Sequence, residues 1–380
     1  MRYLPRFLAL TAILVGGTRA VMADALVRNQ AMEASTILEA FIEEELLRVE
    51  IAVSFPEVAA FADLLPNEFH AKLGHGPEPH AKRMARFFKQ GLAFEADGRL
   101  LPGRLTSIEP RNRTRRDPVS GEPLPPLAGD EPEQVLSFSL EYQLDGTPET
   151  ITLASLPQVP GKGPVNCGFV FYHLGVAVND FRYLVPNLVL DLDWQDPWHT
   201  RFLRRTMKRT YDAPLNVFLY AEPYEVRVEV VVRPLDLQPF VDLGLGETNK
   251  ILPEDYGRIK ERVASFLAGS FQIEIDGEPA EPVLDRVHFL RRTLKSSTVI
   301  DPPQELSTFN AQLGVIYIVP RTGLPREARL TWSIFPEKIT SIPCAATDEA
   351  GALPSSIEPD DPVLVWTNYL KNPSNLARRT

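Results

Sequence analysis

Sequence signatures of enzyme active sites are missing from this chain. It contains no G-x-S-x-G, no H-E-x-x-H, no C-x-x-C and no glycine-rich phosphate loop. Positive charge is also scarce, because 40 Lys and Arg face 50 Asp and Glu and leave a net charge of -10. Phosphate backbones require a basic surface, so this balance argues against nucleic-acid binding. We therefore expect a protein that is not an enzyme and that carries no resident cofactor.

Long apolar runs are scarce too, and the one of note lies near the start of the chain. Phe7–Gly17 are mostly apolar, but a bilayer span requires about 20 residues. Arg2 and Arg6 precede this run and small residues ending at Ala23 follow it, which is the pattern of a secretory signal peptide. We therefore expect a signal peptide over 1–23, a periplasmic or secreted mature chain, and no direct membrane span.

Cysteine is limited to Cys167 and Cys344. In an oxidising compartment the default interpretation of a single pair is a disulfide. The repeat described below places the two cysteines at near-equivalent positions of separate copies, and a bridge requires Cα atoms within about 7 Å. A disulfide would need the copies to pack with these regions face to face, so the bridged and unbridged alternatives both stay open.

What the chain does contain is an internal repeat with an offset of 179 residues. Residues 45–64 (ELLRVEIAVSFPEVAAFADL) align without a gap with residues 224–243 (YEVRVEVVVRPLDLQPFVDL). The identical pairs are Arg48/Arg227, Val49/Val228, Glu50/Glu229, Val53/Val232, Phe61/Phe240, Asp63/Asp242 and Leu64/Leu243.

The same offset extends well beyond this segment, since it aligns 82–98 with 261–277 and 150–157 with 329–336. A constant offset over this length indicates a tandem duplication. We place the copies at about 33–206 and 212–380, and expect the domains to cover 24–206 and 207–380.

The repeated pattern predicts a mainly β fold. In copy two, apolar and charged residues alternate along 224–233, which is the period of a strand with one buried face. A helical period follows over 254–268, with Pro253 before it and Gly269 after it. We therefore expect a mainly β protein with minor α, built from two tandem homologous β-sandwich-like domains. Each has one inserted helix, which lies near 78–90 in the first copy.

Half of the six histidines, His70, His75 and His80, lie in one short segment. Imidazoles beside carboxylates are ligands for zinc, copper or nickel. Glycine and proline residues predict a loop here, and copy two has no histidine at the equivalent positions, so the fold does not require them. A solvated loop and a transition-metal site are the two alternatives. The second would make the protein a metal-binding protein or a metal-dependent hydrolase.

Acidic residues gather in the segment DLDWQDPWHTRF, residues 191–202, at the junction of the copies. Their oxygens are hard ligands suited to calcium, although the glycine and distal glutamate of a full calcium loop are missing. The candidate ligands are Asp191, Asp193 and Asp196.

The same segment combines tryptophan with arginine, the residue types enriched at interface hot spots. We expect a seam, in which Trp194 or Trp198 is buried between the copies or against a partner. The candidate partner-binding residues are Trp194, Trp198, Arg201, Arg204 and Arg205.

Part of each copy is similar to a known family. The segment RVEVVVRPLDLQPFVDLGLGE, the helix after it and FQIEIDG resemble the exported leading domain of HupE/UreJ-like membrane proteins, over about 45–110 and 224–290. Members of that family continue into several transmembrane helices and are regarded as metal permeases. This chain has no such helices, so transport is not carried over. The resemblance implies a docking or sensing module beside a protein partner in the cell envelope, with a multi-pass membrane protein as one candidate.

Overall fold

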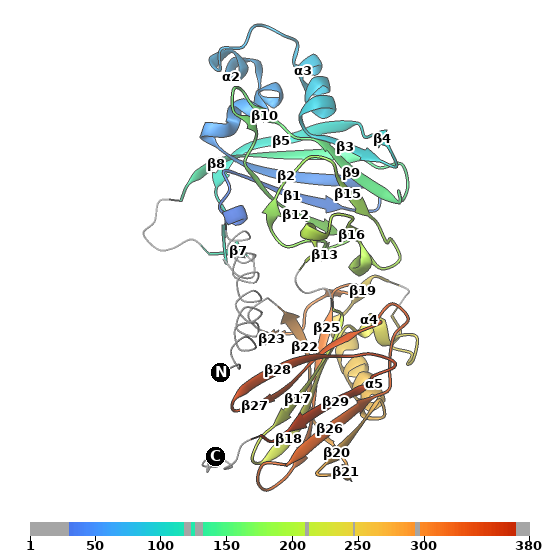
Figure 1. The fold of residues 1–380 in the computed structure, drawn as a ribbon. Coiled ribbons are helices and arrows are strands. Elements are labelled where there is room, and N and C mark those ends of the chain that lie inside the picture. The colour runs from blue at the N-terminus through green and yellow to red at the C-terminus, as the bar shows by residue number, and fades with distance from the viewer. Residues whose placement is uncertain are drawn as a thin grey trace, which may run out of the picture. The chain divides into compact units, whose positions relative to one another are not determined.

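The computed structural model describes residues 30–117, 123–125, 132–209, 213–245, 248–292 and 297–369. The signal peptide expected over 1–23 lies outside the described residues. The chain divides into two compact units, Met1–Tyr211 and Asp212–Thr380, called here the first and second domains (Figure 1). Among the described residues, no helix is both long enough and apolar enough to span a bilayer.

The first domain is built from two sheets that share one hydrophobic core (Figure 1). The larger sheet has the order β13-β12-β1-β2-β8-β5, with β14 also pairing with β12. Its strands are β1 (Thr36–Ile42), β2 (Leu46–Ser54), β5 (Gly103–Asn112), β8 (Gln134–Gln143), β12 (Cys167–His173), β13 (Val176–Ala177) and β14 (Arg182–Tyr183). The smaller sheet has the order β16-β15-β9-β3-β4. Its strands are β3 (Ala93–Ala96), β4 (Arg99–Leu100), β9 (Thr150–Ser155), β15 (Leu188–Asp191) and β16 (Arg201–Phe202).

The second domain also has two sheets around one core. Its larger sheet has the order β23-β22-β25-β18-β17-β27-β28. The strands are β17 (Leu215–Ala221), β18 (Glu225–Val232), β22 (Val283–Arg292), β23 (Ser297–Val299), β25 (Gln312–Pro320), β27 (Ile342–Asp348) and β28 (Gly351–Ile357). The smaller sheet, β21-β20-β26-β29, is formed by β20 (Phe271–Ile275), β21 (Glu278–Ala280), β26 (Glu327–Trp332) and β29 (Val363–Thr367).

The remaining described strands form three short two-stranded ribbons. They are β6 (Arg115–Arg116) with β7 (Pro123–Leu124), β10 (Gln158–Val159) with β11 (Gly163–Pro164), and β19 (Lys250–Ile251) with β24 (Leu306–Ser307).

The two domains have matching strand orders. The path β5-β8-β2-β1-β12 of the first corresponds to β22-β25-β18-β17-β27 of the second, and β4-β3-β9-β15 corresponds to β21-β20-β26-β29. In both larger sheets the first strand pairs antiparallel with its hairpin partner and parallel with a strand from far along the chain. The mainly β fold class is confirmed, and the shared order is what the repeated sequence predicts.

The repeated residues have repeated structural roles. Val49 and Val228 occupy corresponding positions on β2 and β18 and are at most 1% exposed. On the opposite face, the Arg48 guanidinium lies 4.1 Å from the centre of the Phe41 ring, and that of Arg227 lies 4.2 Å from the centre of the Tyr220 ring. Each arginine also pairs with glutamates. Strand alternation therefore separates a buried valine face from a face of arginine–aromatic contacts.

Helical segments connect the first hairpin of each domain to its smaller sheet. The first domain has η1 (Phe55–Leu64), α2 (Asn67–Lys72), α3 (His80–Arg86) and the π-helical turn η2 (Phe87–Gly91). The second domain has α4 (Pro234–Leu237), η5 (Pro253–Asp255) and α5 (Tyr256–Ala268). The helices predicted near 78–90 and 254–268 are therefore present, but they are accompanied by further short helices. The histidine segment expected to be a loop begins with α2, which corrects that prediction.

Replacing Val228 by Asp should unfold the second domain. The side chain is 1% exposed, and an unpaired buried charge costs about 3–5 kcal/mol. Trp332 and Trp366 are buried in this domain's core, so their fluorescence during urea unfolding reports its transition. Glu225→Gln, on the other face of β18, is the matched control and should change stability by less than about 0.5 kcal/mol. An unchanged midpoint for Val228→Asp would show that the face assignment is wrong.

Candidate functional site

The chain after β15 forms an addition to the smaller sheet of the first domain. This edge segment, residues 191–209, comprises a turn, the 3-10 helix η3 (Pro197–His199), β16 and the 3-10 helix η4 (Arg205–Met207). Through β16 it gives that sheet a fifth strand, whereas the described smaller sheet of the second domain has four. It also contains the predicted partner-binding residues and three of the predicted metal ligands.

The aspartates of the edge segment bind backbone and arginine groups. Asp193 Oδ1 accepts hydrogen bonds from the backbone N–H groups of Gln195 and Asp196, at 3.1 and 2.8 Å. Asp196 Oδ1 caps η3 by accepting from the Trp198 N–H at 3.2 Å. Asp191 pairs with Arg201 at 3.0 Å. Across the described ranges, no three His, Cys, Asp or Glu side chains are grouped to hold a metal ion. The calcium site considered above stays an untested alternative.

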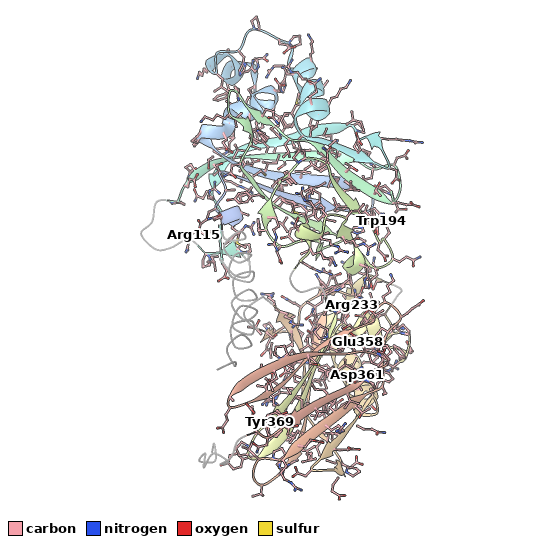
Figure 2. The ribbon with its side chains drawn as sticks, in the orientation of Figure 1. Arg115, Trp194, Arg233, Glu358, Asp361 and Tyr369 are labelled. Atoms are coloured by element: carbon pink, nitrogen blue, oxygen red, sulfur yellow. The ribbon has the colours of Figure 1, made fainter. Side chains whose placement is uncertain are left out.

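The two tryptophans attach the edge segment to the first domain. Trp194, labelled in Figure 2, donates from Nε1 to the Pro148 carbonyl at 2.7 Å. Trp198 is 8% exposed, and the Arg209 guanidinium lies 4.1 Å from the centre of its ring. Arg209 also donates to the Ala177 carbonyl at 2.7 Å and to the Trp198 carbonyl at 2.5 Å. The burial expected for Trp198 is present, while its place in a seam between the copies stays a prediction.

A histidine that sequence reasoning missed lies beneath this segment. His173, the last residue of β12, is fully buried, and its ring makes an edge-to-face contact with Trp194 at 4.5 Å between centroids. Its Nδ1 lies 2.7 Å from Thr200 Oγ1, which also accepts the backbone N–H of Asp193 at 2.9 Å. Burial lowers the pKa of His173 to about 4, although the Asp193 charge opposes this effect. The sequence pattern that could have identified His173 is the alternation along β12, which places this residue on the inward face of the strand.

Beyond β16, the edge segment carries an exposed group of cations around one leucine. Leu203 is 59% exposed. The side chains of Arg204, Arg205 and Lys208 make no hydrogen bond or ion pair with any other described residue. We call this set the basic patch: Leu203, Arg204, Arg205 and Lys208. Phe202 and Met207 alternate with it and are buried in the core at 2% and 6% exposure. The predicted Arg204 and Arg205 therefore lie together on an anchored surface, whereas Arg201 is paired with Asp191.

The predicted histidine ligands do not converge. His70 is buried on α2 and stacks on the exposed His75, with 4.6 Å between ring centroids. His80 lies at the start of α3, with Nε2 3.1 Å from the Leu64 carbonyl oxygen. Burial and the Arg83 charge lower the pKa of His70, so its imidazole is neutral at neutral pH. The segment thus offers a pair of imidazoles with a third directed elsewhere.

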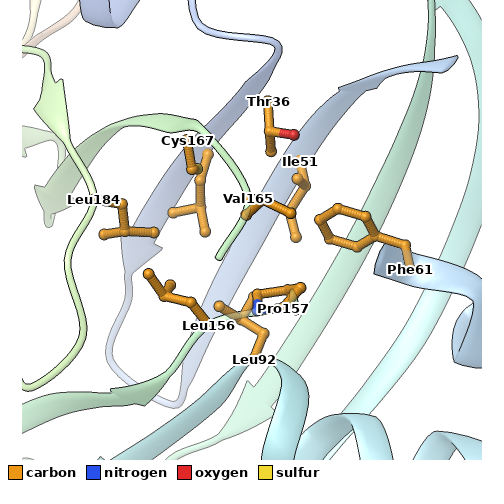
Figure 3. A pocket seen from close by; sticks show the side chains of 10 residues that line it. Thr36, Ile51, Phe61, Leu92, Leu156, Pro157, Val165, Cys167 and Leu184 are labelled. Carbon is orange, nitrogen blue, oxygen red and sulfur yellow. The ribbon is translucent and has the colours of Figure 1, made fainter. Parts of the chain in front are cut away.

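Both cysteines are free, so the disulfide left open by the sequence is not formed. The physical reason is that each lies in the core of its own domain, at 2% exposure for Cys167 and 4% for Cys344. Cys167 lines a cavity of about 10 Å³ with apolar neighbours (Figure 3), and burial raises the pKa of its thiol. A single water needs about 10–15 Å³, so this cavity is too small for a ligand.

No family model matches the chain, and neither does any curated protein. The resemblance to the leading domain of HupE/UreJ-like membrane proteins therefore stays a prediction.

Substitutions of Asp193 distinguish a turn cap from a calcium ligand. Asparagine retains an oxygen that accepts the two N–H groups, so Asp193→Asn should leave the melting temperature nearly unchanged. Asp193→Ala should cost about 1 kcal/mol, because those donors lose their partner. Calcium should shift the melting temperature of neither the wild type nor Asp193→Asn. A rise with calcium in the wild type that vanishes in Asp193→Asn would establish an ion site instead.

Proposed function

We propose that this protein is an exported binding protein that docks onto an acidic surface of a cell-envelope partner through the basic patch. The observation that supports this function is a set of three exposed cations, without partners among the described residues, around an exposed leucine on a chain of net charge -10. Most other arginines of the first domain are engaged, as Arg113 and Arg116 are with glutamates.

The anchoring of the patch favours binding. Phe202 and Met207 fix both ends of a short segment in the core, and Arg209 ties its end to the Ala177 and Trp198 carbonyls. The backbone between them is therefore ordered before any partner arrives. A partner then immobilises side chains only, and this preorganisation reduces the entropy lost on association.

The chemistry of the patch identifies the kind of partner. Arginine forks match carboxylates in a bidentate manner, and the exposed leucine next to Arg204 fits an apolar contact bordered by acids. Electrostatic complementarity of this type steers encounter and selects partners. We therefore expect an acidic protein surface, and the membrane protein suggested by the family resemblance is a candidate for it.

Charge reversal tests the patch directly. The triple variant Arg204→Glu/Arg205→Glu/Lys208→Glu should bind immobilised poly-L-glutamate at least about tenfold more weakly than the wild type at low salt. Added salt should weaken the wild type and leave the variant little changed, since screening acts on exposed charges.

The matched control reverses three exposed cations elsewhere in the first domain, Lys89→Glu/Arg99→Glu/Lys162→Glu, and so changes the net charge by the same amount. It should bind poly-L-glutamate nearly as well as the wild type. Equal losses in control and triple variant would show that net charge, not the patch, governs binding. Tight binding of the wild type to vesicles of anionic phospholipid, without binding to poly-L-glutamate, would show that the patch binds a lipid surface instead of an acidic protein.

A second candidate function is metal binding by the His70–His75 pair, with a metal-dependent hydrolase as its catalytic form. The observation that favours it is the stacking of these imidazoles, with His70 neutral and so in the form that ligates metals. Elemental analysis of protein purified without an affinity tag tests it. We expect no stoichiometric transition metal. A metal that is present in the wild type and lost in the His70/His75/His80 triple alanine variant would favour this alternative.

A further inference from the structure

We infer that His173 is an acid-sensitive latch that holds the edge segment, and with it the basic patch, in place on the first domain. The latch is a property of the isolated protein. Its consequence for docking rests on the function proposed above.

The position of His173 makes it a connection between the core and the edge segment. It ends β12, where its register partners are Ile42 on β1 and Val176 on β13, both buried and apolar. From the edge segment, Trp194 and Thr200 close over it. The imidazole thus connects the large sheet to this segment through a polar side chain, beside the hydrogen bond from Arg209 to the Ala177 carbonyl of β13.

The hydrogen bonds around the ring suit a neutral imidazole. The Thr200 hydroxyl accepts the Asp193 N–H, so its own hydrogen is available to donate to Nδ1 of His173. With the hydroxyl as the donor, the ring proton lies on Nε2. Nε2 is buried and has no hydrogen-bond partner among the described residues. The neutral ring leaves one N–H without a hydrogen bond, which costs less free energy than a buried charge.

Protonation makes the buried site unfavourable. Nδ1 becomes a donor, so the Thr200 O–H hydrogen must rotate away, and its oxygen then accepts from both Nδ1 and the Asp193 N–H. Nε2–H still has no hydrogen-bond partner among the described residues, and a positive charge is placed in a buried site. Asp193 is the charged group that opposes it, but its Oδ1 already accepts two backbone N–H groups. Water can reach the cation only if Trp194 and Thr200 move away. Acid therefore favours a state in which the edge segment has left the sheet.

The second domain provides an internal comparison. Its strand β27 ends at Asp348, as β12 ends at His173, and Asp348 accepts the Trp366 Nε1–H at 3.0 Å. The strand end that carries an imidazole in the first domain therefore carries a carboxylate in the second.

The size of the effect follows from linkage. When the segment opens, His173 regains an ordinary pKa near 6.5, whereas in the closed state its pKa is about 4. The latch is intact above pH 6.5 and weakens as pH falls toward 4, because the open state binds the proton more tightly. The opening equilibrium should rise about 20-fold between pH 7 and pH 5, and about 200-fold relative to pH 7 once the pH is well below 4.

Hydrogen exchange of the isolated protein measures this equilibrium. Peptides covering 188–203 should lose protection by about 20-fold between pH 7 and pH 5, after correction for intrinsic exchange. Peptides around Trp366 in the second domain should keep their protection between pH 7 and pH 5. In His173→Asn, whose side-chain oxygen can still accept from Thr200, the pH dependence should disappear. His199→Asn, in the neighbouring η3, is the matched control and should behave like the wild type.

Two outcomes would overturn the latch. One is a wild-type edge segment whose protection does not change between pH 7 and pH 5. The other is an equal loss of protection in His173→Asn. If that variant does not fold, an NMR titration of the wild-type histidine C–H signals decides, and a His173 pKa near 6.5 rejects the latch. None of these measurements uses a partner, so failure of the docking proposal and failure of the latch are separate results.

Discussion

Both domains depend on the alternation of apolar side chains along their central strands, β2 and β18. Each strand places every second residue in the core, and the strands on both sides take their register from it. The inward residues Val226, Val228, Val230 and Val232 are at most 1% exposed. A slip of one residue would turn this whole set to the opposite face. Because the other face carries arginine–aromatic contacts, the two faces cannot be exchanged.

The repeated sequence is not used identically in the two domains. Phe61 is 1% exposed in the first domain, whereas its counterpart Phe240 is 45% exposed in the second. Asp63 binds Arg86, while the matching Asp242 accepts a hydrogen bond from Arg262, at a different helical position. Positions that fill the core between the sheets are retained more strictly than positions that fasten the connecting helices, because packing tolerates less variation than an exposed ion pair.

The sequence predicted the strands and the long helix well, because their patterns repeat over many residues. The helix α2 was missed since its six residues, placed between Pro66 and Gly74, are too few to show a helical period. Spacing also could not distinguish a ligand cluster from turn caps, because Asp193 and Asp196 use their oxygens on N–H groups two or three residues away. His173 was missed for a different reason. A single histidine at the end of an apolar strand shows its importance only once distant residues close over it.

Parallel pairing of the first strand of each domain with a much later one determines when each domain can be completed during synthesis. Thr36 pairs with Cys167, and Val217 with Cys344, so most of a domain must leave the ribosome before its large sheet closes. Contacts of such long sequence separation make folding slow. The described strands of the first domain all precede β17, so they leave the ribosome before the strands of the second domain. Two copies with similar strands are thereby separated in time, and this order reduces the chance that a strand of one copy is inserted into the sheet of the other.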